Sequence, residues 1–185
     1  MGVNQFVMAY RADHEKIRAL LPGDFESLRP VLRINVEIIS DGPAESRVRI
    51  EFNTPVAARG KRGWLNLKTW ETPRTKITYQ ILDQHVGEKT PGSETAVKGH
   101  TTAFQTDFLE IEYTGVGLAG GCPAENDNDG CFYSDGGEYV FVASEPINAC
   151  KEYCDCRFTW TDPFMEAMKI EREEILGAYK VTFNR

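Results

Sequence analysis

The sequence predicts a mainly β (α+β) fold, in which an antiparallel sheet forms a closed or cone-like β-barrel accompanied by two helices. Short segments of alternating, β-branched or aromatic residues recur along most of the chain. Clusters of Gly, Pro, Asp and Ser separate these segments, and helical periodicity occurs only near the two ends. Many short strands with few helices favour closure, because a closed sheet has no exposed edge.

The first helix is expected directly after Asp13. The Asp13 side chain can accept a hydrogen bond from the first helical amides. Ile17, Leu20 and Leu21 recur at spacings of three and four residues, which places them on one helix face. Pro22 then ends the helix, because proline has no backbone N–H to donate.

The remaining chain is expected to consist mostly of strands. These strands are predicted at residues 6–10, 31–39, 47–52, 65–70, 76–82, 100–104, 108–116, 139–143, 157–160 and 179–183. The acidic, Gly-rich stretch 120–137 is interpreted as a long surface loop. The mouth or interior of the resulting barrel is the expected ligand site.

A second helix is expected to begin near Asp162 and Pro163 and to end near Gly177. Asp is a common helix cap, and Pro is common at the first helical position. The stripe packed against the core would consist of four apolar residues, Phe164, Met168, Ile175 and Leu176.

Length, composition and charge limit the possible classes of protein. The 185 residues, 41% of them hydrophobic, are expected to form a single domain spanning residues 1–185. The net charge of -7 would repel a phosphate backbone. No apolar run reaches the roughly 20 residues that cross a bilayer, and no secretory signal is recognised. We therefore expect a cytoplasmic homo-oligomer with no nucleic-acid partner and no membrane partner.

The cysteines allow two interpretations. The chain has five, Cys122, Cys131, Cys150, Cys154 and Cys156. An odd number without an export signal argues against a complete disulfide framework. Four of the sulfurs could in principle hold zinc, but their spacing lacks the paired pattern of known zinc motifs. Free thiols and no bound metal are therefore expected.

Several segments resemble the acetoacetate decarboxylase superfamily. The chain runs from an aromatic strand through Tyr10-Arg11-Ala12-Asp13 to a helix ending Leu20-Leu21-Pro22, and then to a strand led by Pro30. The passage from Pro55-Val56 through Lys61 to Trp64-Leu65 is similar to another part of that family. The end of the chain, with Trp160-Thr161-Asp162-Pro163 and the strand through Tyr179 to Phe183, is a weaker likeness.

This resemblance implies an acetoacetate decarboxylase-like domain and a lyase chemistry, decarboxylation or a related reaction. In that chemistry a lysine forms a Schiff base with a small keto acid, and the imine accepts the electron pair released when carbon dioxide leaves. The lysine must be unprotonated to attack the ketone, so an apolar pocket or a neighbouring cation must lower its pKa. No cofactor is implied.

The resemblance also implies positions for the site residues. It places the reactive lysine region around residues 86–92, so Lys89 is the candidate catalytic lysine. A lysine in a turn with Gly and Pro is more commonly a solvated residue. Lys76 is the alternative, because a strand lysine could point into the barrel. Glu51 lies near one of the family's two pocket glutamates and is the second catalytic candidate, while Asn35 takes the place of the other and is a substrate-binding candidate.

Three features depart from the family pattern. The chain has no Lys-Lys pair, the family's arginine before the first strand has no counterpart, and Asn35 can donate and accept hydrogen bonds but cannot relay a proton. The expected function is a Schiff-base enzyme acting on a small keto acid. Two alternatives stay open, a non-catalytic β-barrel that binds a small carboxylate or apolar ligand, and a metal-dependent protein that uses the late cysteines.

Overall fold

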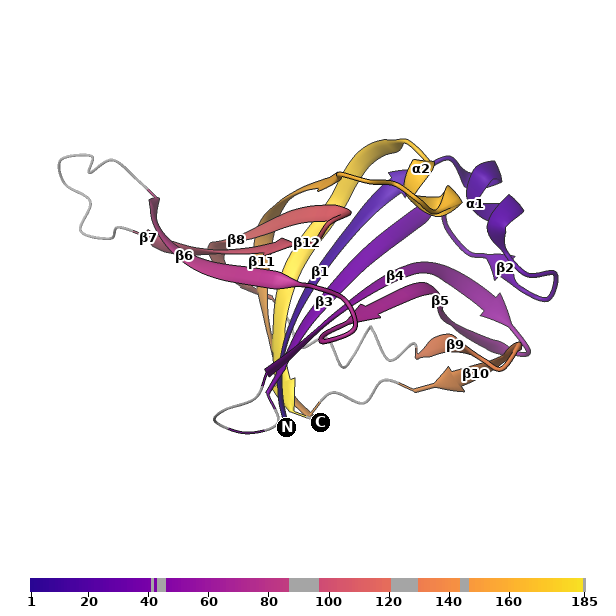
Figure 1. The fold of residues 1–185 in the computed structure, drawn as a ribbon, viewed down its shortest axis with the longest axis horizontal. Coiled ribbons are helices and arrows are strands. Elements are labelled where there is room, and N and C mark those ends of the chain that lie inside the picture. The colour runs from indigo at the N-terminus through magenta and orange to yellow at the C-terminus, as the bar shows by residue number, and fades with distance from the viewer. Residues whose placement is uncertain (41, 43–45, 87–96, 121–129, 144–146, 185) are drawn as a thin grey trace.

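The computed structural model describes residues 1–40, 42, 46–86, 97–120, 130–143 and 147–184, and it shows one large curved sheet with two short helices (Figure 1). The helices are α1 (His14–Leu20) and α2 (Glu166–Lys169). The strands are β1 (Gly2–Ala12), β2 (Glu26–Ser27), β3 (Val31–Ser40), β4 (Ser46–Ala58), β5 (Lys61–Glu71), β6 (Thr78–Val86), β7 (Val97–Gln105), β8 (Leu109–Gly120), β9 (Cys131–Asp135), β10 (Glu138–Val142), β11 (Ile147–Trp160) and β12 (Arg172–Asn184).

The mainly β prediction is confirmed, and the sheet is cone-like rather than closed. Within the described residues its order is β10-β9-β5-β4-β3-β1-β12-β11-β8-β7-β6, with β2 beside β4. Neighbouring strands pair antiparallel except for β5 and β9, which form a short parallel pair in that part of the chain. Figure 1 shows the strands gathered near the two termini and spread apart toward the helices.

Strand β1 lies in the middle of the sheet, between β3 and β12. It pairs along its whole length with β3 on one side and with β12 on the other. Gly2 lies opposite Asn184, so the two ends of the chain are neighbours (Figure 1). The segments that resemble the decarboxylase family at the start and the end of the sequence therefore meet in space.

The main core lies on one face of β1, β3 and β4. Alternate residues of these strands, including Met8, Ile34 and Phe52, are fully buried there, as strand periodicity requires. The opposite wall of this core comes from β7, β8 and β11. It contributes the aromatic residues Phe104, Tyr113 and Phe158. Phe6 packs against Phe104 with ring centroids 5.2 Å apart, a typical aromatic contact.

The first helix is confirmed. Asp13 caps α1, and its side chain accepts a hydrogen bond of 3.0 Å from the backbone N–H of Lys16. Ile17 is the buried residue of this helix, and the helix ends before Pro22. The local signals of cap, apolar stripe and proline were sufficient to predict this helix.

The second predicted helix is wrong over most of its length. Only Glu166–Lys169 is helical, and Arg172 to Asn184 form strand β12. This strand is hydrogen-bonded to β1 on one side and to β11 on the other. Pairing with two strands distant in sequence outweighs the helix propensity of the Glu- and Arg-rich segment. Of the proposed stripe Met168 is buried, whereas Phe164 and Leu176 are exposed.

The loop predicted at 120–137 contains a strand. Cys131 to Asp135 form β9, which pairs with β5 and β10, while residues 121–129 lie outside the described part of the chain. The Gly, Asn and Asp residues that flank β9 in the sequence weaken the alternating pattern that predicts a strand. Phe132 of β9 is nevertheless buried against Phe25 and Phe141. Lys76, expected at the start of a strand, lies before β6 and is exposed.

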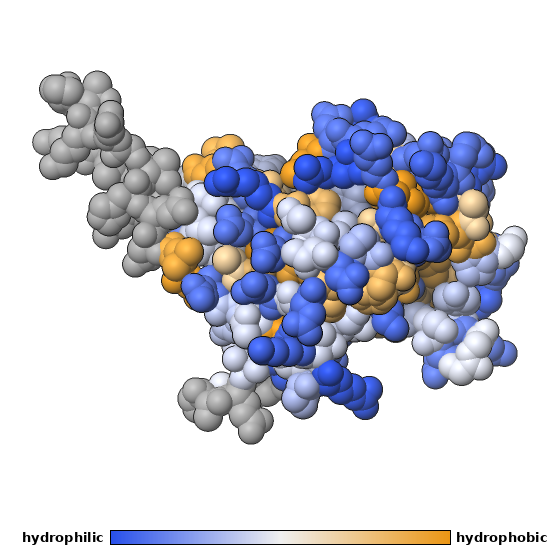
Figure 2. All heavy atoms as spheres, turned by 45° about the horizontal axis from the view of Figure 1, so that its top comes forward, coloured by the Kyte–Doolittle hydropathy of each residue, from blue (hydrophilic) through white to orange (hydrophobic). Residues whose placement is uncertain are grey.

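The surface mixes polar and apolar residues. On the face shown in Figure 2, hydrophobic residues lie among hydrophilic ones rather than forming one continuous cover. The most exposed large apolar side chains include those of Ile81 and Leu118. In the described residues, no helix has the length and apolar character needed to cross a membrane.

Replacing Ile34 with alanine should strongly destabilise the fold. Ile34 is 0% exposed in the main core, so Ile34→Ala leaves a cavity and is expected to lower the free energy of unfolding by about 2–5 kcal/mol. Ile81 is 63% exposed, and Ile81→Ala serves as the matched control with little effect. Urea unfolding of both variants measures the difference, and equal losses would show that the core is placed wrongly.

Candidate functional site

Strands β3 and β4 are buried on both faces, and one of these faces is polar. The even-numbered residues of these strands from Leu32 to Val36 and from Ile50 to Phe52 point into the main core. The odd-numbered residues carry charges and amides, in opposed pairs Arg33 with Asn53, Asn35 with Glu51, and Glu37 with Arg49. We call Asn35, Glu37, Arg49, Glu51 and Tyr133 the polar cluster.

Asn35 and Glu51 lie side by side in this cluster. They are register partners across β3 and β4, and each is only 3% exposed. A buried carboxylate is costly unless it is paired and hydrogen-bonded. The structure therefore brings together the two polar residues proposed from the sequence for this site, and their surroundings must supply the compensation.

Arg49 supplies most of that compensation. Its Nη2 and Nε lie 2.6 and 3.1 Å from Oε2 of Glu37, and its Nε lies 3.5 Å from Oε1 of Glu51. Gln5 of β1 donates a further hydrogen bond of 3.1 Å to Glu37. Burial by itself lowers the pKa of Arg49, but Glu51 and Glu37 raise it, and the net direction is upward. Arg49 thus stays a cation between two carboxylates.

Tyr133 of β9 completes the cluster. Its hydroxyl donates a hydrogen bond of 2.9 Å to Oε1 of Glu51, across 82 positions of sequence. Burial, and then the adjacent Glu51 carboxylate, raises the pKa of Tyr133 well above its usual value. The phenol therefore remains protonated and acts as a hydrogen-bond donor to Glu51.

Two polar atoms in this region are buried without a hydrogen-bond partner in the described residues, Oδ1 of Asn35 and Nε of Arg33. The Arg33 guanidinium stacks on the ring of Trp64, with its carbon 3.6 Å from the ring centroid. An unpaired buried acceptor is uncommon and often marks a position that a ligand or water satisfies. The free oxygen of Asn35 could accept a hydrogen bond from a bound molecule.

This arrangement can support acid–base chemistry. Glu51 offers a carboxylate that can accept a proton, Tyr133 orients it, and Arg49 balances its charge. A positioned carboxylate of this kind contributes about 10²–10⁴-fold to the rate of a proton transfer. The cluster has no nucleophile of its own for a ketone, since none of its members is an amine.

The lysines proposed from the sequence are not part of the described cluster. Lys89 lies in residues 87–96, outside the part of the chain that the structure describes. Lys76 is exposed. None of the lysines whose side chains are described is buried, and Lys151 and Lys180 are half-buried on aromatic rings instead. The identity of a reactive lysine stays a prediction.

The cysteines show no arrangement for a metal within the described residues. No group of three His, Cys, Asp or Glu side chains there could hold a metal ion, and Cys122 falls outside them. Cys131, Cys150, Cys154 and Cys156 are free thiols. Burial raises the pKa of Cys131 to about 12, and the charge of Glu51 acts in the same direction.

Comparison with solved structures identifies the fold. An acetoacetate decarboxylase from Legionella pneumophila subsp. pneumophila str. Philadelphia 1 superposes with a TM-score of 0.68, covering 99% of this chain and 82% of its own. An acetoacetate decarboxylase-like enzyme from Sphingomonas wittichii RW1 superposes with a TM-score of 0.66, covering 98% of this chain and 87% of its own. The chain has an acetoacetate decarboxylase-like fold. The structure of the enduracididine biosynthesis enzyme MppR complexed with pyruvate is also similar, with a TM-score of 0.63 that covers 98% of this chain and 84% of its own.

Sequence identity to these acetoacetate decarboxylase-like proteins is low. It is 11% for the Legionella enzyme, 10% for the Sphingomonas enzyme and 14% for MppR. No family model and no curated protein sequence matches the chain. The likeness therefore concerns the fold, and the chemistry of this chain must be argued from its own residues.

Sequence reasoning missed three members of the polar cluster in this fold, Glu37, Arg49 and Tyr133. A signal existed for the first two, because Glu37 follows Asn35 by two residues and Arg49 precedes Glu51 by two, which puts them on the same strand faces. No comparable signal existed for Tyr133. Its place depends on the short parallel pairing of β9 with β5.

Removing Arg49 should destabilise the protein because Glu37, whose side chain is 1% exposed, would keep a buried charge without its cation. We expect Arg49→Met to cost about 3–5 kcal/mol of unfolding free energy, measured by urea titration. Arg47→Met is the matched control. The Arg47–Glu71 pair is exposed, and its loss should cost at most about 1 kcal/mol.

A second substitution tests the cause of that loss. Glu37→Gln added to Arg49→Met removes the unpaired charge and should restore part of the stability. If the double variant is less stable than Arg49→Met alone, uncompensated charge is not the reason for the loss.

The thiols should differ in reactivity toward iodoacetamide at pH 8. Cys150 is exposed, whereas Cys131 is buried with a pKa of about 12, so very little of Cys131 is present as the reactive thiolate. Peptide mapping is expected to find Cys150 modified well before Cys131 in the native protein, and both modified in urea. Equal rates of modification of Cys150 and Cys131 in the native protein would contradict the burial of Cys131.

Proposed function

We propose that this protein is a Schiff-base enzyme, a decarboxylase or related lyase, that acts on a small keto acid. The observation that carries the proposal is the buried pairing of Glu51 with Asn35, with Arg49 and Tyr133 in hydrogen-bond or ion-pair contact. The acetoacetate decarboxylase-like fold supports the same chemistry, since a solved relative of that fold is described as complexed with pyruvate.

The proposed reaction begins at a lysine, for which Lys89 is our candidate. Its amine nitrogen attacks the ketone carbon, and the ketone oxygen leaves as water to give the imine. When the substrate is a β-keto acid, the bond between the α-carbon and the carboxylate carbon then breaks, carbon dioxide leaves, and the electron pair moves into the protonated imine to form an enamine. A proton is added to carbon, and water hydrolyses the new imine to release the ketone and the lysine.

The polar cluster has separate roles in this scheme. Glu51 moves protons at the imine-forming and protonation steps, because its carboxylate can accept a proton and it is the register partner of Asn35. Asn35 orients the reacting group, because its unpaired Oδ1 can accept a hydrogen bond from the N–H of the protonated imine. Tyr133 and Arg49 are positioning residues, since each acts on Glu51 rather than on the substrate.

A non-catalytic barrel that binds a small carboxylate is the second candidate. It is favoured by Asn35, which cannot relay a proton, and by the position of Lys76, which is exposed. A cytoplasmic location and a homo-oligomeric assembly are further proposals that rest on the sequence.

Borohydride trapping distinguishes the two candidates. With acetoacetate or pyruvate present, borohydride should reduce the imine and fix the ligand to Lys89, with a saturable mass increase located by peptide mapping. An ordinary solvated lysine has a pKa of about 10.4 and is almost wholly protonated at pH 7, so rapid single-site labelling reports a perturbed amine. Lys89→Ala should show no mass increase.

Glu51→Gln is the companion variant. It preserves the shape of the side chain and should slow labelling by about 10²-fold or more if Glu51 moves the protons. Labelling at Lys76 would support the Schiff-base chemistry and would make Lys76, rather than Lys89, the reactive lysine. If no lysine traps either keto acid while a ligand still raises the melting temperature, the non-catalytic barrel is the better account.

A further inference from the structure

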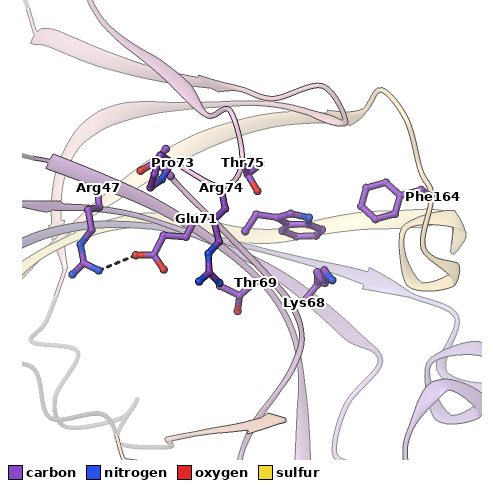
Figure 3. Close-up of a pocket in the computed structure, with 10 residues that line it drawn as sticks. Arg47, Lys68, Thr69, Glu71, Pro73, Arg74, Thr75 and Phe164 are labelled. Atoms are coloured by element: carbon purple, nitrogen blue, oxygen red, sulfur yellow. Dashed lines mark hydrogen bonds and ion pairs between the residues drawn. The ribbon is translucent and has the colours of Figure 1, made fainter. Parts of the chain in front are cut away.

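A pocket of about 890 Å³ lies beside the second half of β5, and no member of the polar cluster lines it. It is lined by Lys68 to Glu71 of β5, by the following turn from Thr72 to Thr75, and by Arg47 and Phe164. Figure 3 shows Arg47, Glu71 and Arg74 gathered at one end, with Phe164 at the other. Strand β5 pairs with β9 only at Trp64 and Leu65, so no described strand covers this part of its edge.

The pocket is cationic although the whole chain carries a net charge of -7. Arg47, Lys68 and Arg74 line it together with a single carboxylate, Glu71. Arg47 is paired with Glu71 at 2.9 Å, as the dashed line in Figure 3 marks. Lys68 and Arg74 form no ion pair with any other described residue. Two positive charges are therefore available to an anion.

The turn that carries Arg74 is held at both ends. The Thr75 backbone N–H donates to the Glu71 carbonyl at 2.9 Å, and that of Thr72 donates to the Val48 carbonyl at 3.0 Å. The Thr72 hydroxyl accepts from the Val48 N–H at 3.0 Å. Arg74 thus projects from an anchored backbone, which lowers the entropy cost of fixing it on a ligand.

The other end of the pocket is aromatic. Trp70 is 7% exposed and packs on Phe108 at 4.7 Å between ring centroids, while Phe164, 51% exposed, meets it edge-on at 6.2 Å. Phe164 belongs to the segment before α2, where the sequence had suggested a packed helix stripe. An exposed aromatic ring beside a buried one offers a surface for an apolar ligand group.

We propose that this pocket binds a small organic acid, with its carboxylate on Arg74 and Lys68 and its aromatic or branched apolar body against Trp70 and Phe164. The guanidinium of Arg74 matches a carboxylate through two parallel hydrogen bonds. An inorganic anion would leave the aromatic end unused. The site needs no imine, so it goes beyond the proposed catalytic function and stands independently of it.

Calorimetric titration with two ligands of the same shape tests the site. Phenylacetate should bind, and phenylacetamide, which lacks the charge, should bind about tenfold more weakly or not at all. Phenyl phosphate, as a third ligand, distinguishes a carboxylate site from a general anion site. Raising the salt concentration should weaken phenylacetate binding, because the cations are exposed to solvent.

The variants use a matched control that lies just after the same turn. Arg74→Gln should weaken phenylacetate binding about tenfold, and Lys68→Gln should weaken it by a smaller factor. Lys76→Gln removes the same charge two residues away but outside the pocket lining, and should leave binding within about twofold. Arg74→Lys keeps the charge and should retain part of the affinity. Unchanged melting temperatures exclude a folding defect.

Several outcomes overturn the proposal. These are equal affinity for phenylacetamide and phenylacetate, equal losses in Lys76→Gln and Arg74→Gln, tighter binding of phenyl phosphate than of phenylacetate, or no binding of any ligand. Failure of the catalytic proposal has a different signature. If Lys89 traps no keto acid while phenylacetate still binds and Arg74→Gln still weakens it, the pocket stands and the Schiff-base function falls.

Discussion

The pairing of β3 with β4 in the middle of the sheet is the constraint on which the rest of this structure depends. Both strands have buried residues on both faces, so one face must bury Glu37 and Glu51 away from water, with Arg49 partly buried beside them. Isolated charges in such a place would cost several kcal/mol each. The fold tolerates them because opposed register positions bring opposite charges together and because Gln5 and Tyr133 satisfy remaining lone pairs.

The register of β4 also determines what lies beside the polar cluster. A bulge between Phe52 and Asn53 shifts the pairing with β5, so that Glu51 faces Thr69 and Asn53 faces Asn66. Before the bulge β5 is flanked by β9, and after it no described strand covers the edge. The first half of β5 therefore supports the buried cluster through β9, and the second half borders the cationic pocket.

Local signals in the sequence predicted the parts of the fold that depend on neighbouring residues. The helix after Asp13 and most strands were found from caps, prolines and alternation. Arg172 to Asn184 were predicted as helix up to Gly177 because the segment has good helix formers, and only the distant partners β1 and β11 make it a strand. The same limit applies to the site. Glu51 and Asn35 could be proposed from strand parity and the family resemblance, whereas Tyr133 could not, because its contact joins segments 82 residues apart.

The scaffold and the polar face of this chain are subject to different physical restraints. The strands that resemble the decarboxylase family lie adjacent in the sheet, β12-β1-β3-β4-β5, and they contribute one wall of the main core. Core packing restrains these residues regardless of the reaction, since a cavity there costs stability. The polar face depends on charge balance, and Arg49 with Tyr133 supplies that balance around Glu51 while Asn35 is neutral. An amide at position 35, where the family resemblance implies a carboxylate, is therefore compatible with the fold, although an amide cannot relay a proton.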